Sequence, residues 1–277
     1  MPGLPLDRLA EVLRRLGPLV LWEARAHVRS RLQVAASVSA ALVVALLAWR
    51  LSSGDAVAAL LPRYDPLLGA LFLLTPFRDP VLQLPQLAFG YALLRWTVTG
   101  MVIVSRITLP VVAASAVAAE RKTGRMQELQ LTLFPGWAIY FAKVIAATLP
   151  VLVPGLALFL LFSGVALSTG VSAGEMLRLL LEMGGQVLLV ACVSVSLSAL
   201  FRSPQAAWVA ACCVLWVLLP LGWSGLRALV TGSLASFLAA TEGREISFVT
   251  WYLLQTAVIV TVCGLAAVVG IRRLRPD

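Results

Sequence analysis

The chain has 277 residues, of which 60% are hydrophobic and only 13% are charged. A soluble domain with so few charges would expose too much apolar surface, so the composition excludes a soluble protein and predicts an integral membrane protein. The formal net charge of +9 does not indicate nucleic-acid binding, because the basic residues are distributed as in membrane proteins.

The N-terminal region, residues 1–33, is too charged for a cleavable signal peptide. Leu6, Leu9 and Leu13 repeat at helical spacing, whereas Arg14 lies elsewhere on the helical wheel. Basic amphipathic helices of this kind lie along the inner membrane surface. The region therefore predicts cytoplasmic, interfacial amphipathic helices.

Six apolar stretches predict six transmembrane helices in an all-α polytopic fold, because a span needs about 20 apolar residues. The stretch Leu67–Phe77 is too short to cross, and we expect it to be interfacial or re-entrant, as we do for Leu226–Ala240. The predicted spans are residues 34–51, 97–119, 138–162, 177–201, 206–221 and 248–271.

The distribution of basic residues predicts the orientation. With the N-terminus in the cytoplasm, the inner segments, including the tail 272–277, carry a large excess of Arg and Lys, whereas the outer loops are balanced by acidic residues. This is the positive-inside pattern. It predicts both termini in the cytoplasm, a location in the cytoplasmic (inner) membrane, and anionic membrane lipids as partners.

Ionisable residues also fall inside or near the predicted spans. Arg106 lies near the middle of the second span and Glu182 about two turns into the fourth. Because intramembrane charges are energetically costly, Arg106 should face the protein interior or water and have a partner. Glu182 has three interpretations: it pairs with Arg178, it pairs with Arg106, or it lines a cargo path. Lys143, near the start of the third span, is expected to extend to the inner headgroups.

The chain becomes strongly polar between Ala119 and Ala138. In hydrocarbon each charge there would cost roughly 2.5–3.5 kcal/mol, so the segment must be a loop or a short helix at a membrane face. Thr123 is a plausible N-cap for a short helix over about residues 123–133. The charged residues are Glu120, Arg121, Lys122, Arg125 and Glu128.

This segment resembles the loop between the second and third spans of type-2 ABC exporter permeases. That family has Glu-Arg, Gly-Thr, an acidic residue, a Leu-rich turn, Thr-Pro, and Gly-Lys opening the next span. The residues in register here are Glu120, Arg121, Gly124, Leu129, Leu131, Thr132, Pro135, Ile139 and Lys143. The sequence departs from the pattern at Arg125, Gln127, Leu133 and Ala142, which leaves the subfamily open. The motif covers less than a tenth of the chain.

The resemblance implies a permease subunit whose short helix, residues 123–133, seats in a groove of an ABC ATPase subunit and transmits its motion. It also implies a second permease subunit, either identical or related. The positions that it implies for coupling are Glu120, Arg121, Gly124, Glu128 and Leu129.

The sequence itself has no Gly-x-x-x-x-Gly-Lys-Ser/Thr motif, so we expect ATP-Mg to bind in the partner and this chain not to be an enzyme. Ser224 lies in a Gly-x-Ser-Gly pattern, but the only histidine, His27, belongs to the opposite side of the membrane, so no catalytic pair is expected. No metal-binding cluster is expected either. The alternative function is a nucleotide-independent secondary transporter or membrane scaffold that uses Arg106 and Glu182.

Overall fold

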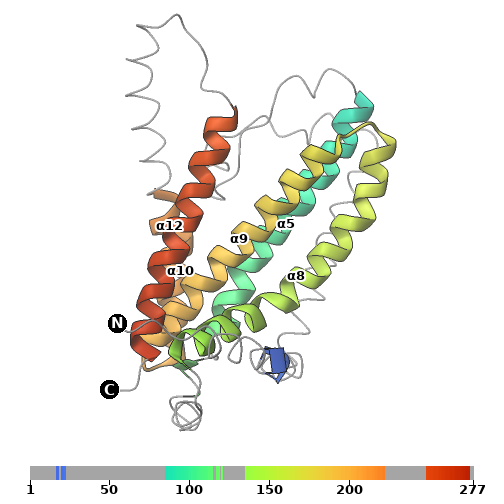
Figure 1. Ribbon diagram of the computed structural model, residues 1–277. Coiled ribbons are helices and arrows are strands. Elements are labelled where there is room, and N and C mark those ends of the chain that lie inside the picture. The colour runs from blue at the N-terminus through green and yellow to red at the C-terminus, as the bar shows by residue number, and fades with distance from the viewer. Residues whose placement is uncertain are drawn as a thin grey trace, which may run out of the picture.

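The structure of the protein is a computed structural model (Figure 1). It describes residues 17, 18, 20–22, 85–114, 117, 118, 120, 135–221 and 248–274. These residues form helices and short turns, and no strand occurs among them. The all-helical fold class is therefore confirmed for the described ranges.

Five helical segments among the described residues are long and apolar enough to cross a membrane, which indicates a multi-pass membrane protein. The structure has a helix over each of the five predicted spans after the first. The helices are α5 (Pro85–Ala114), α8 (Gly136–Ser168), α9 (Ala173–Leu200), α10 (Pro204–Cys213) with its π-helical continuation η3 (Val214–Leu218), and α12 (Phe248–Leu274).

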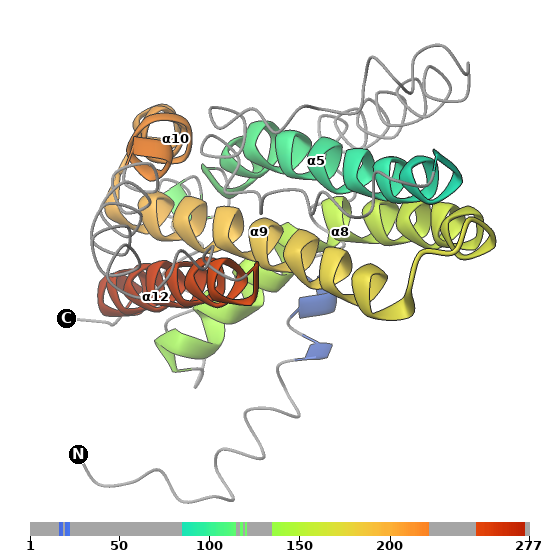
Figure 2. The same cartoon turned by 90° about the horizontal axis from the view of Figure 1, so that it is seen from above.

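Helix α9 is the centre of the bundle, because it packs against α5 on one side and α12 on the other (Figure 2). Helix α8 packs against both α5 and α9, and α10 also contacts these two helices. The buried apolar residues come mainly from α5, α8 and α9, and examples are Leu94, Met101, Ala147, Leu179 and Leu189. Helices α5, α8 and α9 therefore form a tightly packed body, and α10 and α12 lie at its margin.

Local sequence explains where these helices begin. The Ser172 hydroxyl caps α9 by accepting a hydrogen bond of 3.2 Å from the backbone N–H of Glu175. The Ser203 hydroxyl caps α10 in the same way, and Pro204 occupies the first turn, where its missing N–H is not needed. Between α8 and α9, Gly170 has a φ of 91°, which a residue without a side chain adopts readily.

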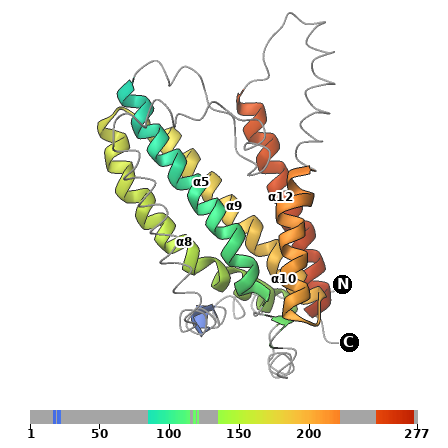
Figure 3. The same ribbon diagram turned by 180° about the vertical axis from the view of Figure 1, so that it is seen from behind.

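Helix α8 is bent, and its first turns run at a clear angle to the rest of the helix (Figures 1 and 3). Pro150 and Pro154 lie in its interior. Each proline removes a backbone donor and its ring clashes with the preceding turn, so a kink is expected there. The bend lets the start of α8 pass beneath the bundle while its second half runs beside α5.

The second helix begins earlier than its predicted span. The prediction begins at residue 97, whereas α5 already begins at Pro85. Proline is favourable in the first turn of a helix, and the run from Leu87 to Leu94 continues the apolar pattern of the span. As a result Arg95 lies inside α5 and is buried, not in an outer loop.

Several sequence predictions fall outside the described residues. These are the first span over residues 34–51, the two outer stretches Leu67–Phe77 and Leu226–Ala240, and nearly all of the N-terminal region and the C-terminal tail. Of the N-terminal region, residues 17, 18 and 20–22 are helical, and the side chains of Leu21 and Trp22 are exposed.

Candidate functional site

The candidate site lies where the second predicted span meets the charged segment. The Lys143 ammonium donates a hydrogen bond of 2.7 Å to Glu120 Oε2, which joins the end of the α5 region to the second turn of α8. The Lys143 side chain is 0% exposed and the Glu120 side chain is 17% exposed. The predicted extension of Lys143 to the lipid headgroups is therefore wrong, because its charge is satisfied inside the protein.

The backbone that leads to Glu120 is held by α9. The N–H of Ala118 donates to the Ser198 hydroxyl at 3.2 Å, and both Val117 and Ala118 are fully buried. Ser198 lies in the last turn of α9, so this contact places the approach to Glu120 at the C-terminal end of that helix. Glu120 is thus fixed both by its own side chain and by the residues before it.

The first turns of α8 are held by both α9 and α12. The Tyr140 hydroxyl lies 3.0 Å from the Ser196 hydroxyl and donates to the Cys192 carbonyl at 3.2 Å. Ser196 in turn donates to the Ala266 carbonyl of α12 at 2.6 Å. The Tyr140 ring lies against Gly270, where an added Cβ would collide with it. Three helices, α8, α9 and α12, are therefore linked at the first turns of α8.

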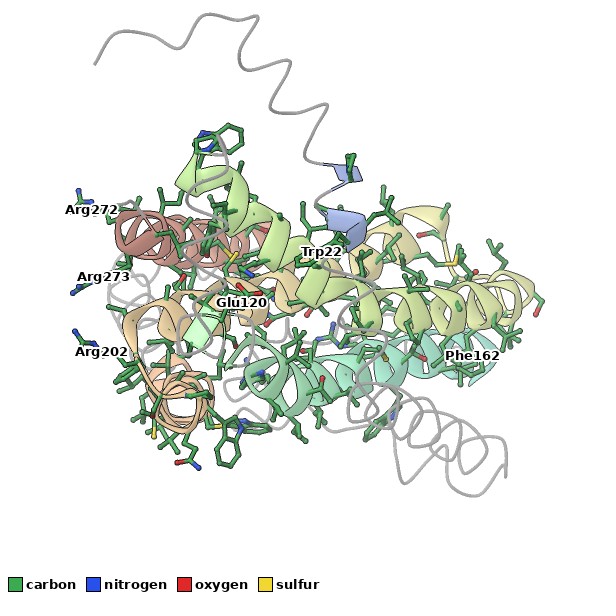
Figure 4. All side chains as sticks on the ribbon, turned by 90° about the horizontal axis from the view of Figure 1, so that it is seen from below. Trp22, Glu120, Phe162, Arg202, Arg272 and Arg273 are labelled. Atoms are coloured by element: carbon green, nitrogen blue, oxygen red, sulfur yellow. The ribbon has the colours of Figure 1, made fainter. Side chains whose placement is uncertain are left out.

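Basic side chains gather at one edge of the same end of the bundle. Arg202 follows the C-terminus of α9, and Arg272 and Arg273 lie in the last turn of α12. All three are exposed, and they project away from the bundle, while Glu120 lies among the helices (Figure 4). Cations are favourable near helix C-termini because the carbonyl groups there carry a partial negative charge.

The structure describes only one of the residues that are predicted to couple the chain to an ATPase. Glu120 is described, whereas Arg121, Gly124, Glu128, Leu129 and the predicted helix over residues 123–133 lie outside the described residues. The described parts of the motif are its beginning, Glu120, and its end, residues 135–143. These two parts are in direct contact through the ion pair with Lys143.

The structure does not bring together the two predicted intramembrane charges, Arg106 and Glu182. Glu182 Oε2 accepts a hydrogen bond of 2.7 Å from Arg95 Nη1, and both side chains are almost fully buried. Arg106 lies eleven residues further along α5, which corresponds to about 16 Å along the axis. Arg178, the other predicted partner of Glu182, bonds to Glu175 at 2.8 Å.

Arg106 of α5 is fully buried, and its side chain contacts the fifth predicted span. Its Nη1 donates to the Leu215 carbonyl at 3.1 Å, and its guanidinium lies 6.0 Å from the centre of the Trp216 ring. Both partners belong to the π-helical turn η3, a rare conformation that often occurs at functional sites. Arg106 thus fixes this turn to α5.

Sequence reasoning missed Arg95 as the partner of Glu182 and Lys143 as the partner of Glu120. For Arg95 a signal was present, because apolar residues flank it on both sides from Leu87 onward. For Lys143 the sequence gives no such signal, since a lysine near the end of a span ordinarily reaches the headgroups. Both ion pairs depend on which helices pack together, and the sequence pattern does not specify that packing.

Among the described residues, no group of three or more His, Cys, Asp or Glu side chains could hold a metal ion. In comparisons with known proteins, no family model and no curated protein matches this chain. The arrangement therefore has to be interpreted from its own charges and contacts.

Proposed function

We propose that this chain is a transmembrane permease subunit of an ATP-driven ABC exporter, which couples a separate ATPase subunit to the export or extrusion of a substrate. One observation carries the proposal. The segment that resembles the coupling loop of such permeases begins at Glu120 and ends at Lys143, and these two residues form an ion pair. A loop that receives force from a partner needs ends that are fixed to the spans, and this contact supports that requirement.

The proposed topology has six spans with both termini in the cytoplasm. Five helices of sufficient length and apolarity support it, and the predicted span over residues 34–51 would be the sixth. Arg202, Arg272 and Arg273 lie at the same end of the bundle as Glu120, which is the basic, cytoplasmic end under the positive-inside rule. The location would be the cytoplasmic membrane, with anionic lipids around this end.

In the proposed mechanism, this chain binds no nucleotide. ATP binding closes the partner ATPases, which push the short helix over residues 123–133 through Arg121, Gly124, Glu128 and Leu129. Glu120 passes the movement to α5 and α8, and the spans then change the side to which they open. A second permease subunit, identical or related, would complete the transporter.

The test is purification of the tagged chain in lipid nanodiscs, with identification of every co-purifying protein. We expect an ATPase subunit whose turnover falls at least about fivefold when Glu120→Gln or Gly124→Val is introduced, which is the lower range of allosteric coupling. The absence of any ATPase, or normal turnover in both variants, would contradict the proposal.

One observation favours the alternative, a nucleotide-independent secondary transporter or scaffold. Charged side chains, Arg95 with Glu182 and also Arg106, lie buried within the candidate spans, as in ion-coupled carriers. If the alternative holds, the chain will purify without an ATPase, and ion gradients alone will drive transport that Glu182→Gln abolishes.

A further inference from the structure

The ion pair between Lys143 and Glu120 connects the two chain segments that carry the predicted loop. Glu120 directly precedes residues 121–134, and Pro135 joins them to α8, which begins at Gly136. Lys143 lies in the second turn of α8 and reaches back to Glu120. The contact of 2.7 Å therefore links the residue that enters the loop to the helix that follows the loop.

The burial of this pair makes it sensitive to the loss of either partner. The Lys143 side chain has no exposed surface, so its ammonium would stay buried without this carboxylate if Glu120 were replaced by a neutral residue. The electrostatic attraction is also stronger there than in water, because the surroundings have a low dielectric constant. Breaking a buried pair by removing one partner is strongly destabilising for this reason.

The surroundings of the pair are rigid on the α9 side. The backbone N–H of Ala118 is bonded to Ser198, and the Tyr140 hydroxyl is bonded to Ser196, so α9 contacts the chain on both sides of the pair. Ala142, next to Lys143, is buried as well. The pair thus joins two fixed segments, and the loop between them is the part that a partner can push.

We propose that Lys143 is a positioning residue for the loop: its ammonium holds Glu120 and thereby fixes both ends of residues 121–134. This inference rests on the proposed function, in which an ATPase pushes the loop. With the pair intact, force on the loop moves α5 and α8 together. Without the pair, the ends of the loop separate locally and the force is lost before it reaches the spans.

The first experiment measures how fast chymotrypsin cleaves the loop of the full-length chain in lipid nanodiscs, with fragments identified by mass spectrometry. Leu129, Leu131 and Leu133 are cleavage sites that no variant alters. Lys143→Met and Glu120→Gln should each speed cleavage about tenfold or more, because the rate follows the population of the locally open form. The charge swap of Glu120→Lys with Lys143→Glu should return most of the protection.

The matched control is Glu182→Gln, which breaks another buried ion pair remote from the loop. Because it destabilises a different contact between α5 and α9, it should speed loop cleavage far less than Lys143→Met does. If Glu182→Gln and Lys143→Met speed loop cleavage equally, the inference is overturned, because the loop would then open through a general loss of protein stability. Unchanged cleavage in Lys143→Met, or a swap variant that inserts normally and stays as sensitive as the single variants, would overturn it too.

The second experiment measures the ATPase turnover of the co-purified complex. Lys143→Met should lower the maximal rate and leave the KM for ATP unchanged, since the nucleotide site lies in the partner, whereas Lys143→Arg should retain most of the rate. Faster loop cleavage without any co-purifying ATPase would support the inference on Lys143 and contradict the proposed function. A co-purifying ATPase, together with unchanged loop cleavage and unchanged turnover in Lys143→Met, would support the proposed function and contradict the inference on Lys143.

Discussion

Helices α9 and α12 have similar lengths and similar apolar composition, yet they occupy opposite environments. Inside the protein, 72% of the most apolar stretch of α9 is buried, against 11% for α12. Helix α9 contacts α5, α8, α10 and α12, whereas α12 contacts only α9 and α8 closely within the described residues. The difference teaches that hydropathy alone identifies a span but does not tell whether protein or membrane surrounds it.

The two helices also differ in where they carry polar groups. Helix α9 buries Glu182, Gln186, Ser194, Ser196 and Ser198, and several of these bond to other helices. The exposed residues of α12 include Val260, Leu265, Val268 and Val269, which suit contact with lipid chains or another protein chain. Polar contacts therefore define the packed body, and the apolar face of α12 defines its margin.

The largest effect should come from the ion pair at the centre of the packed body. Glu182→Gln leaves the Arg95 guanidinium buried with a neutral neighbour, which should destabilise the protein by about 3–5 kcal/mol. Thermal unfolding in nanodiscs measures this. The double variant with Arg95→Met and Glu182→Leu should recover most of the loss. A small effect of Glu182→Gln would mean that the pair does not stabilise the contact between α5 and α9.

A smaller effect should come from a close contact between α5 and α8. A side chain at Gly90 would collide with the Thr169 hydroxyl and approach the Ala166 backbone to 3.0 Å, so Gly90→Ala should destabilise by about 1–3 kcal/mol. Gly184 of α9 is the matched control, because nothing lies within 4 Å of an added Cβ there. Gly184→Ala should be neutral or stabilise by up to about 1 kcal/mol. Equal unfolding temperatures for the two variants would contradict the packing of α5 against α8.

The next effect concerns the hydroxyl that links α8 to α9. Tyr140→Phe keeps the ring against Gly270 but removes the hydrogen bonds to Ser196 and Cys192, at a cost of about 0.5–1.5 kcal/mol. Equilibrium unfolding of the variant measures the loss. Ile145→Val is a suitable control, because Ile145 lies on the same helix and its side chain is exposed. An equal or larger loss for Ile145→Val would contradict the stabilising role of the Tyr140 hydroxyl.

The smallest effect should come from α12. Leu265 is 64% exposed, so Leu265→Ala should change stability by less than about 0.5 kcal/mol in a nanodisc that contains one copy of the chain. Thermal unfolding at low and high protein density in the membrane tests this. A marked loss that appears only at high density would show that a second copy covers the face of α12.

The sequence could predict the helices but not their partners. The length and apolarity of residues 138–162 or 248–271 are local properties, and the structure has helices there, although α8 continues to Ser168 and α12 to Leu274. The contact between Arg95 and Glu182 joins residues 87 positions apart, which no local pattern specifies. The start of α5 at Pro85 is hard to predict, because proline interrupts a helix interior but is also a common first residue of a helix.

For the candidate site, the sequence pointed to the polarity change after Ala119 and to Glu120, but the role of Lys143 was misinterpreted. Whether a lysine near the end of a span reaches water or a carboxylate depends on which helix lies beside it. Here the contact of Ala118 with Ser198 brings Glu120 within reach of α8. The packing of the helices, not the residue type, therefore determines that Lys143 pairs with Glu120.

The separation of Arg95 from Glu182 also has a consequence for biosynthesis. At a synthesis rate of about 5–20 residues per second, the separation of 87 positions corresponds to roughly 4–17 seconds of translation. During that interval the nascent chain carries the guanidinium of Arg95 in α5 before the matching carboxylate exists. The insertion machinery must therefore shelter that span, or let it wait near the water interface, until the fourth span arrives.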